Sequence, residues 1–203
     1  MQITYSWEPF ISYGQKKEIK KNTTLYSQGE IGNGFYYLHE GEIQIKMLSD
    51  KGDERIIDYI SPGELLGEQG VKGEPYFTTA KTTKPSTIFF YSKEDLQTIC
   101  KKHSAASDII LNSLVKKVRL LAETVSIQDS SMEHQLAHII YKLYRKNQNP
   151  CISIDQTSLS NYIGTSRVTI YKILQQWKEN EIVNITDRKI RIINVNKFQD
   201  LLY

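Results

Sequence analysis

A change of pattern near residue 107 is the sequence feature that most constrains the fold of this chain. Residues 22–93 alternate short apolar runs with turn residues, whereas residues 107–126 contain neither Gly nor Pro. The first pattern predicts an antiparallel sandwich or barrel of short strands, and the second predicts a long helix. The strand-sized runs are residues 35–38, 43–47, 56–60 and 86–91.

The expected helix carries a regular apolar stripe. Its apolar residues recur at steps of three and four, which is the heptad pattern of a two-stranded coiled coil. We interpret this stripe as a dimer interface; the alternative is a helix that packs on its own domain. We expect Ile109, Ile110 and Val115 to face the sandwich. The stripe consists of Leu111, Leu114, Val118, Leu121 and Val125.

Two short helices with a tight turn are predicted near the C-terminus, after another helix over residues 131–146. Asp155 is a suitable N-cap for a helix that extends to Ile163, and Ser166 can cap a second helix over residues 167–180. Gly164 and Thr165 form the turn between them, as in a helix-turn-helix. Apolar runs at 182–185 and 190–193 flank a charged turn, which predicts a short hairpin with the shape of a wing.

Composition excludes several classes of protein. Hydrophobic residues make up 39% of the 203 residues and charged residues 24%, a globular balance. No run approaches the roughly 18 apolar residues that cross a membrane, and residues 1–10 lack the apolar core of a secretory signal. We therefore expect a cytoplasmic protein with no membrane partner. The two cysteines, Cys100 and Cys151, predict neither a disulfide framework nor a four-cysteine metal site.

No metal or cofactor site is predicted. His39, His103, His134 and His138 are scattered along the chain. His134 and His138 share a helical face at a spacing of four residues, but the sequence indicates no third ligand. We also expect no enzyme activity, because a metal enzyme on the β-rich half would need several His and Glu ligands on its strands, where only His39 lies.

The excess of positive charge lies in the C-terminal part. Residues 129–203 contain 10 Lys and Arg against 7 Asp and Glu, whereas the rest of the chain is balanced. A basic excess beside a helix-turn-helix is a mild indication of nucleic acid. A recognition helix enters the major groove at its N-terminal end, where Arg can bond guanine twice. Ser166, Thr169, Arg167 and Lys172 lie at that end, while Tyr171 and Arg188 can touch the backbone. The alternative is that Arg167 and Lys172 are only solvated charges.

Taken together, these pieces resemble the Crp/Fnr family of bacterial transcription regulators over about residues 22–194. The sequences that carry the resemblance are 25–30 (LYSQGE), 35–38 (FYYL), 41–45 (GEIQI), 61–64 (SPGE), 67–68 (GE) and 163–169 (IGTSRVT). The family implies an α+β fold of two domains. They are an antiparallel β jelly-roll sensor resembling the cyclic-nucleotide-binding domain (residues 1–106) and a winged helix-turn-helix (129–203), joined by a dimerisation helix (107–128).

The resemblance also implies roles for single residues of the second short helix. Arg167, Val168 and Lys172 match positions that read bases, and Ser166 and Thr169 match positions that touch phosphate. Relatives often have Glu at position 168, which accepts a hydrogen bond from cytosine. Val168 offers only apolar contact, for example to a thymine methyl group, so we expect a different base preference there.

The sensor half departs from the nucleotide-binding pattern. In nucleotide-binding relatives a Gly-Glu pair holds the ribose and a following Arg pairs with the cyclic phosphate. Gly67 and Glu68 are present, but residues 69–80 contain no Arg, and Glu74 stands near its place. Lys72 cannot supply the bidentate fork of Arg, so we expect no cyclic AMP binding and only a structural role for Glu68 in its turn. The candidate effector pocket comprises Gly67, Glu68, Gln69, Lys72, Thr78 and Thr79.

These observations predict a homodimeric regulator that binds double-stranded DNA at a near-palindromic site. The alternatives are a cyclic-nucleotide-responsive regulator and a nucleotide-binding signalling module whose C-terminal half contacts protein. RNA polymerase is a further partner that the resemblance implies, although no residue pattern identifies a surface for it. The sequence names neither an effector nor an operator, and it does not distinguish activation from repression.

Overall fold

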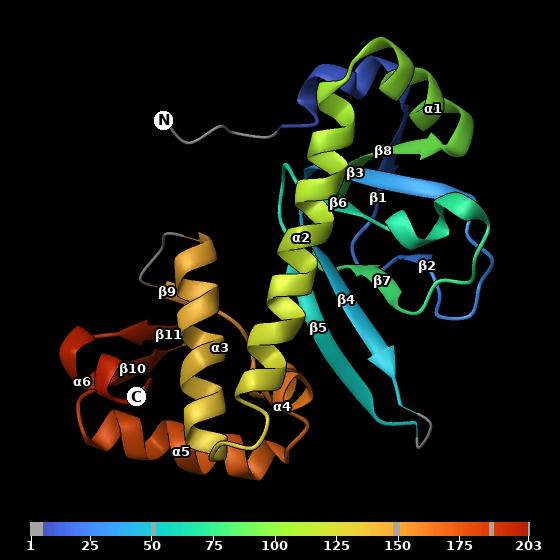
Figure 1. Cartoon of the computed structure of the whole chain (residues 1–203). Helices are drawn as coiled ribbons and strands as arrows, with labels where there is room; N and C mark the ends of the chain where they lie inside the picture. Colours follow the sequence, from blue (N-terminus) through green and yellow to red (C-terminus); the bar gives the residue numbers. More distant parts are fainter. Residues whose placement is uncertain (1–5, 50–51, 148–150, 187–188, 203) are drawn as a thin grey trace. The chain divides into compact units, whose positions relative to one another are not determined.

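The chain divides into two units, Met1–Leu121 and Ala122–Tyr203. The structure is a computed structural model that describes residues 6–49, 52–147, 151–186 and 189–202 (Figure 1). None of the helices in these residues has the length and apolar character that a membrane crossing demands. Each unit is built around sheets of its own, so each is described separately below.

The N-terminal unit is a roll of two four-stranded antiparallel sheets, as predicted from the Gly-punctuated runs. One sheet has the order β1-β8-β3-β6 and the other β2-β7-β4-β5. The four strand-sized runs of the sequence lie in β3, β4, β5 and β8, whereas the short strands β1, β2, β6 and β7 were not predicted. The strands are β1 (Gln15–Ile19), β2 (Thr24–Tyr26), β3 (Gly34–Glu40), β4 (Ile43–Leu48), β5 (Glu54–Ile60), β6 (Leu65–Leu66), β7 (Thr79–Thr82) and β8 (Ser86–Ser92).

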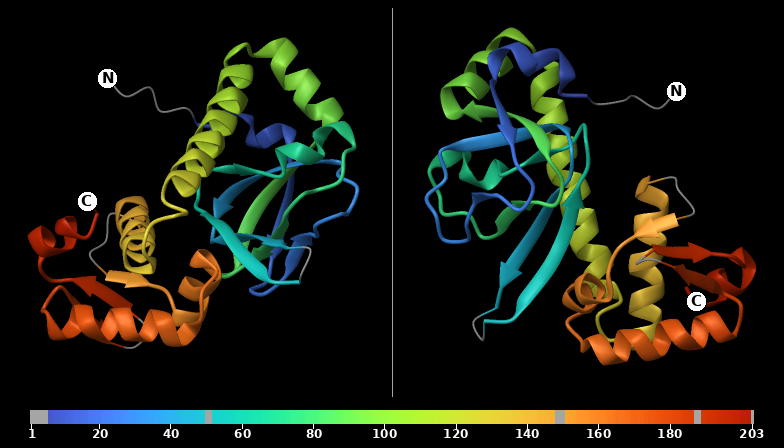
Figure 2. Two further views of the ribbon diagram at one scale, coloured as in Figure 1. Left: turned by 60° about the horizontal axis from the view of Figure 1, so that its bottom comes forward. Right: turned by 180° about the vertical axis from the view of Figure 1, so that it is seen from behind.

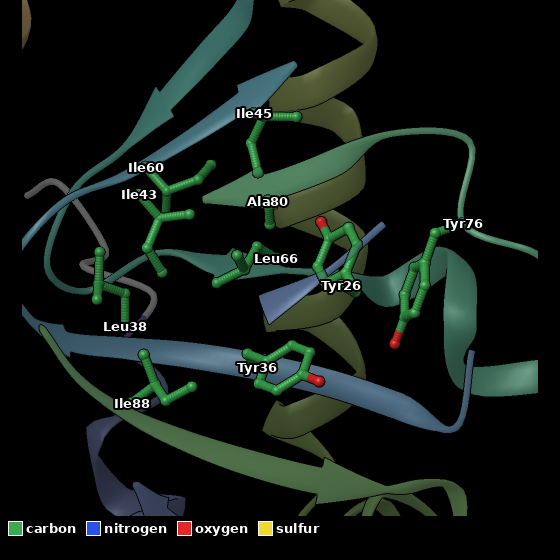
Figure 3. Packing of buried hydrophobic residues seen from close by; sticks show 10 residues of the cluster. All are labelled: Tyr26, Tyr36, Leu38, Ile43, Ile45, Ile60, Leu66, Tyr76, Ala80 and Ile88. Atoms are coloured by element: carbon green, nitrogen blue, oxygen red, sulfur yellow. The ribbon is translucent and has the colours of Figure 1, made fainter. Parts of the chain in front are cut away.

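Strand β3 is buried on both faces, which explains its unbroken apolar sequence. Successive side chains of a strand point to opposite faces. Tyr36 and Leu38 therefore join the cluster between the sheets, while Phe35 and Tyr37 pack on the outer face of their sheet. Figure 3 shows the inner cluster, which consists of Tyr26, Tyr36, Leu38, Ile43, Ile45, Ile60, Leu66, Tyr76, Ala80 and Ile88.

Helices cover the outer face of the β1-β8-β3-β6 sheet. Helix α1 (Lys93–Lys102), which was not predicted, begins with a capping box in which Ser92 and Asp95 exchange hydrogen bonds. It lies at the same end of the roll as the 3-10 helix η1 (Glu8–Tyr13) (Figure 1). A second 3-10 helix, η2 (Glu68–Lys72), follows β6. Trp7, Phe10 and Ile99 contribute to the cluster that these helices bury.

The predicted long helix is α2 (Ala105–Ser126). Ile109 and Ile110 pack against the outer cluster of the roll, as expected. The expectation for Val115 was wrong, because this side chain is 48% exposed. At about 100° per residue, Val115 lies on the opposite side of the helix from the buried Ala106.

The C-terminal unit packs helices around a three-stranded antiparallel sheet of order β10-β11-β9, seen from two further sides in Figure 2. The predicted hairpin is β10 and β11, in which Val183 pairs with Ile192. The core contains Leu136, Trp177 and Phe198. Neither β9 nor α6 was predicted. The elements are α3 (Met132–Asn147), β9 (Cys151–Ser153), α4 (Gln156–Ile163), α5 (Arg167–Glu179), β10 (Val183–Thr186), β11 (Lys189–Ile192) and α6 (Val195–Asp200).

Candidate nucleic-acid interface and effector pocket

The turn between α4 and α5 has the geometry of a helix-turn-helix. The Asp155 carboxylate accepts a hydrogen bond from the Ser158 amide at 2.7 Å, so α4 begins where the sequence predicts. Gly164 ends α4 in the left-handed conformation, with φ of 79°, which glycine adopts without strain. The Gly164 amide donates to the Ser160 carbonyl at 2.7 Å. Helix α5 starts three residues later.

Helix α5 is sharply divided into a buried and an exposed face. Ile170, Leu174 and Trp177 are buried. Val168 is 61% exposed and Tyr171 51% exposed, although both are large apolar side chains. The combination of exposed apolar side chains and cations makes this face a candidate contact surface. The exposed side chains of the first turns are Arg167, Val168, Tyr171 and Lys172.

The two cations of this face have no partner within the described part of the chain. Neither Arg167 nor Lys172 forms an ion pair there, and both are exposed. They are five positions apart, so they lie about 140° apart around the helix axis and flank Val168 and Tyr171. A groove of DNA would meet positive charge at both edges of this face and an apolar side chain between them.

Ser166 and Thr169 serve the helix start and keep one donor free. The Ser166 hydroxyl accepts a hydrogen bond from the Thr169 amide at 3.0 Å, and the two hydroxyl oxygens are 2.9 Å apart. A single shared hydrogen bond uses only one of the two hydroxyl protons. The other is available to a phosphate at the N-terminus of α5, where the helix dipole favours an anion.

The wing adds further cations. Lys189 and Arg191 are exposed on β11. Lys189 pairs with Ser153 of β9, so the wing is held by a strand that the sequence did not indicate. The predicted backbone contact Arg188 lies outside the described residues.

The predicted dimer residues form an exposed stripe on α2. Leu111 is 60% exposed, Val118 66% and Val125 66%, and Leu114 and Leu121 are also exposed. A stripe of Leu and Val on one side of a helix is unfavourable in water. The stripe is therefore the candidate dimer interface.

The candidate effector residues are not all brought together. Gly67 precedes η2 as its N-cap in the left-handed conformation, and the side-chain amide of Gln69 donates to the Thr78 hydroxyl at 3.1 Å. Thr78 is buried, whereas Thr79 accepts a hydrogen bond from the Gln28 backbone at 3.0 Å. Lys72 is exposed at the end of η2.

Glu68 has more than the expected role in its turn. Its carboxylate accepts hydrogen bonds from the Lys117 ammonium at 2.5 Å and from the Ser113 hydroxyl at 2.7 Å. Both partners belong to α2. This connection was not predicted, although Ser113 and Lys117 are four residues apart and thus share a helix face. Their spacing was the available signal.

Three tyrosines fill the roll next to η2. The rings of Tyr26 and Tyr76 are stacked with centroids 4.0 Å apart, and Tyr36 stacks on Tyr26 at 6.0 Å (Figure 3). The Tyr76 hydroxyl donates to the Gly34 carbonyl at 3.2 Å. Burial raises the pKa of all three phenols above the usual range of tyrosine. They therefore remain neutral.

Comparisons with known proteins agree with both units. Residues 16–103 match the cyclic nucleotide-binding domain, and residues 134–201 match the Crp-like helix-turn-helix domain. The chain is similar to the cyclic AMP receptor protein of Thermus thermophilus, with 20% identity over 95% of this chain and 90% of that protein. It is also 22% identical to the fumarate and nitrate reduction regulatory protein of Vibrio cholerae, over 92% of this chain and 78% of that protein.

Solved structures show the same fold. The c-di-GMP-responsive global regulator CLP of Xanthomonas campestris superposes with a TM-score of 0.80 at 16% identity, over 93% of this chain and 98% of that chain. The relatives are regulators of transcription rather than enzymes, as predicted. The predicted fold class, an N-terminal antiparallel β domain with a C-terminal helix-turn-helix, is confirmed.

Proposed function

The chain belongs to the Crp/Fnr family of DNA-binding transcription regulators, and we propose that it acts as a homodimer on a near-palindromic site. Each copy contributes one helix α5 to the major groove. In dimers of this kind the two recognition helices read half-sites about 34 Å apart. A symmetric DNA sequence is the natural partner of a symmetric dimer.

The exposed face of α5 carries the proposal of DNA reading. Arg167 supplies two parallel donors for the O6 and N7 atoms of guanine, a contact worth about 1–3 kcal/mol of discrimination. Lys172 contacts a second base, and the free hydroxyl proton of the Ser166–Thr169 pair binds a phosphate. We assign Tyr171, Lys189 and Arg191 as further contacts to the DNA backbone. Each of these side chains is exposed, and each is polar or cationic.

The apolar stripe of α2 supports the homodimer. Two copies of α2 bury their Leu and Val side chains against each other in a heptad seam. Lys116 and Arg119 lie between seam positions and are exposed, so the face of α2 away from the seam is charged and solvated. A second copy of this chain is the occupant that the heptad spacing favours.

The sensor domain does not use cyclic AMP in this proposal. The stretch from Gln69 to Ala80 contains no Arg to pair with a cyclic phosphate, and Lys72 is exposed at the end of η2. We further assign the protein to the cytoplasm, where its DNA lies. RNA polymerase is a proposed partner on the family resemblance alone.

Selection from a random duplex DNA pool with purified, ligand-free protein tests the proposal. We expect enrichment of a two-fold symmetric sequence. Arg167→Ala should lower the preference for the guanine of each half-site by a factor of about 5 to 150, the equivalent of about 1–3 kcal/mol. Quantitative sequencing of bound and unbound pools measures this preference.

Lys178→Ala is the matched control, because Lys178 is an exposed cation at the other end of α5. Its loss removes the same charge without removing a base contact, so all sequences should weaken alike. Full selectivity in the Arg167→Ala variant would contradict the assignment of the recognition helix. Absence of any enriched sequence, with and without cell extract, would instead favour a signalling module that contacts protein.

A further inference from the structure

The buried carboxylate of Glu68 is fully used within the chain. Its side chain is only 6% exposed, and both oxygens lie 2.5 Å from the ammonium nitrogen of Lys117. The Ser113 hydroxyl donates to one of them. Lys117 also donates to the Leu65 carbonyl at 3.0 Å. The three protons of the ammonium group thus have three acceptors, and a carboxylate that burial would otherwise penalise is paired and hydrogen-bonded.

This cluster joins η2 of the roll to α2. Glu68 is the first residue of η2, which directly follows β6 of the roll. Lys117 and Ser113 belong to α2, whose adjacent face carries the stripe of the proposed dimer. Breaking the pair by moving either element would leave a charge without its counter-ion at a largely buried position, which is strongly unfavourable.

The tyrosine rings occupy the space on the inner side of η2. Tyr26, Tyr36 and Tyr76 are 2%, 8% and 2% exposed. A methyl group at Gly70 would lie 2.5 Å from Cε1 of Tyr76, and one at Gly67 would lie 3.3 Å from Cε1 of Tyr26. The backbone of η2 therefore rests on the rings, with no room left for even one added carbon atom at Gly70.

The surroundings of the rings are also unfavourable for an anion. Burial is the main cause of the raised pKa of each tyrosine. The nearby Glu68 carboxylate adds to the raised pKa of Tyr26, and Glu30 adds to that of Tyr36 and Tyr76. Both carboxylates would repel a phosphate at this position. Lys117, the cation nearest to Glu68, already shares its charge with that carboxylate.

We infer that the sensor roll is occupied by its own side chains, and that the Glu68–Lys117–Ser113 cluster fixes α2 to the roll without any nucleotide. This inference rests on the proposed function in one respect: a permanently fixed α2 keeps the DNA-binding dimer assembled. The chain is then a constitutive DNA-binding protein rather than a nucleotide-triggered one.

Calorimetric titration of the full-length, ligand-free protein with cyclic AMP, cyclic GMP and cyclic di-GMP tests the occupied roll. We expect no heat of binding and no shift of the thermal unfolding temperature at millimolar nucleotide. Saturable binding of any of the three at micromolar concentration would overturn the inference. Neither measurement uses DNA, so their outcome is separate from that of the proposed function.

Hydrogen exchange tests the cluster on α2. Lys117→Gln should raise the exchange rates of the backbone amides of residues 113–121 at least about tenfold, because a local opening that the ion pair opposes becomes easier. Lys116→Gln, an equal loss of charge at the exposed neighbour, should leave them unchanged, and Lys117→Arg should largely preserve protection. Equal exchange in the Lys117→Gln and Lys116→Gln variants would contradict the role of the cluster. If Lys117→Gln does not fold, the inference is tested by the exchange protection of Lys117→Arg and by the calorimetric titration.

Affinity for the selected DNA site completes the experiment. Ligand-free protein should bind the site within about twofold of its affinity in the presence of each nucleotide, since a ligand that does not bind shifts no equilibrium. A gain of tenfold or more on adding a nucleotide would overturn the inference and leave the DNA-binding function standing. Failure to bind any DNA would refute the proposed function. The calorimetry and the hydrogen exchange would still test whether the roll excludes nucleotides and whether the cluster holds α2.

Discussion

At the scale of single residues, Val168 distinguishes this chain from relatives that carry Glu at the same position. Its side chain is 61% exposed between Arg167 and Lys172 on α5. An exposed β-branched side chain at the start of a recognition helix has no role in the core, since the buried face of α5 is formed by Ile170, Leu174 and Trp177. We therefore propose that Val168 contacts DNA.

Val168→Glu should change the base that this position prefers. A carboxylate accepts a hydrogen bond from cytosine N4, whereas valine offers only apolar contact, for example to a thymine methyl group. We expect enrichment to move from thymine to cytosine at one base of each half-site, with the other positions unchanged. Selection with both variants in parallel measures this shift, and an identical consensus for the two proteins would contradict base contact by residue 168.

We expect His138 to make the stability of the C-terminal unit depend on pH. Partial burial lowers its pKa, and the neighbouring His134, whose ring centroid is 4.5 Å away, lowers it further. The Leu202 backbone and Glu123 act in the opposite direction with smaller effects. Because the folded pKa is below the unfolded value of about 6.5, the unfolded chain binds more protons as the pH falls through that value.

The free energy of unfolding of this unit should therefore decrease from about pH 7.5 to about pH 5.5. His138→Gln should flatten this dependence, and His103→Gln, in the other unit, should not. Denaturant titrations followed by Trp177 fluorescence, in a Trp7→Phe background, isolate the C-terminal transition. An unchanged pH slope in the His138→Gln variant would show that another group is responsible.

At the scale of elements, α2 combines two faces with different tasks. Ile109 and Ile110 attach the helix to the roll, while the stripe from Leu111 to Val125 is exposed. Val115 lies outside both faces and is exposed as well. It corresponds to a position that flanks a coiled-coil seam, where charged residues are common.

Val118→Lys should weaken the proposed dimer at least about tenfold, because a seam position would bury an unpaired charge from each copy. Val115→Lys is the matched control, since it introduces the same residue three positions earlier on the same helix. We expect its effect to be small. Sedimentation equilibrium over a range of concentrations gives both dissociation constants, and equal effects of the two substitutions would argue against the heptad seam.

At the scale of the whole molecule, the proposed function depends on a two-fold symmetric dimer. A dimer with one α5 per copy reads half-sites whose centres are about 10 base pairs apart, or one helical turn. The spacing is a property of the assembled dimer and not of either unit alone.

Inserting about 5 base pairs between the half-sites should abolish two-point binding, because half a turn moves one half-site to the other face of the duplex. Affinity should fall to that of a single half-site. Changing the sequence of the same spacer without changing its length is the control. Fluorescence anisotropy with labelled duplexes measures both, and an affinity that ignores the insertion would indicate that the copies bind independently.

Most of the elements were predictable from the sequence, because the patterns that identify them are local. The alternation in β4, the capping residues Asp155 and Ser166, and Gly164 in the left-handed conformation each specify a structure within a few residues. Strand β9 could not be found in this way, since three residues carry too little periodicity and become a strand only by pairing with β11. The prediction for Val115 was wrong for a different reason. An apolar residue on a helix does not show by itself which face of the helix is buried.

The sequence by itself determined the longer strands and helices and their order, the Crp-like helix-turn-helix, and the absence of Arg from residues 69–80. Only the tertiary structure decided the partner of the Glu68 carboxylate, which is Lys117, 49 residues away in the sequence. It also decided that Tyr26, Tyr36 and Tyr76, from separate segments, gather in one stack. Periodicity and capping depend on neighbours in sequence, whereas the partner of a buried charge depends on which surfaces the fold brings together.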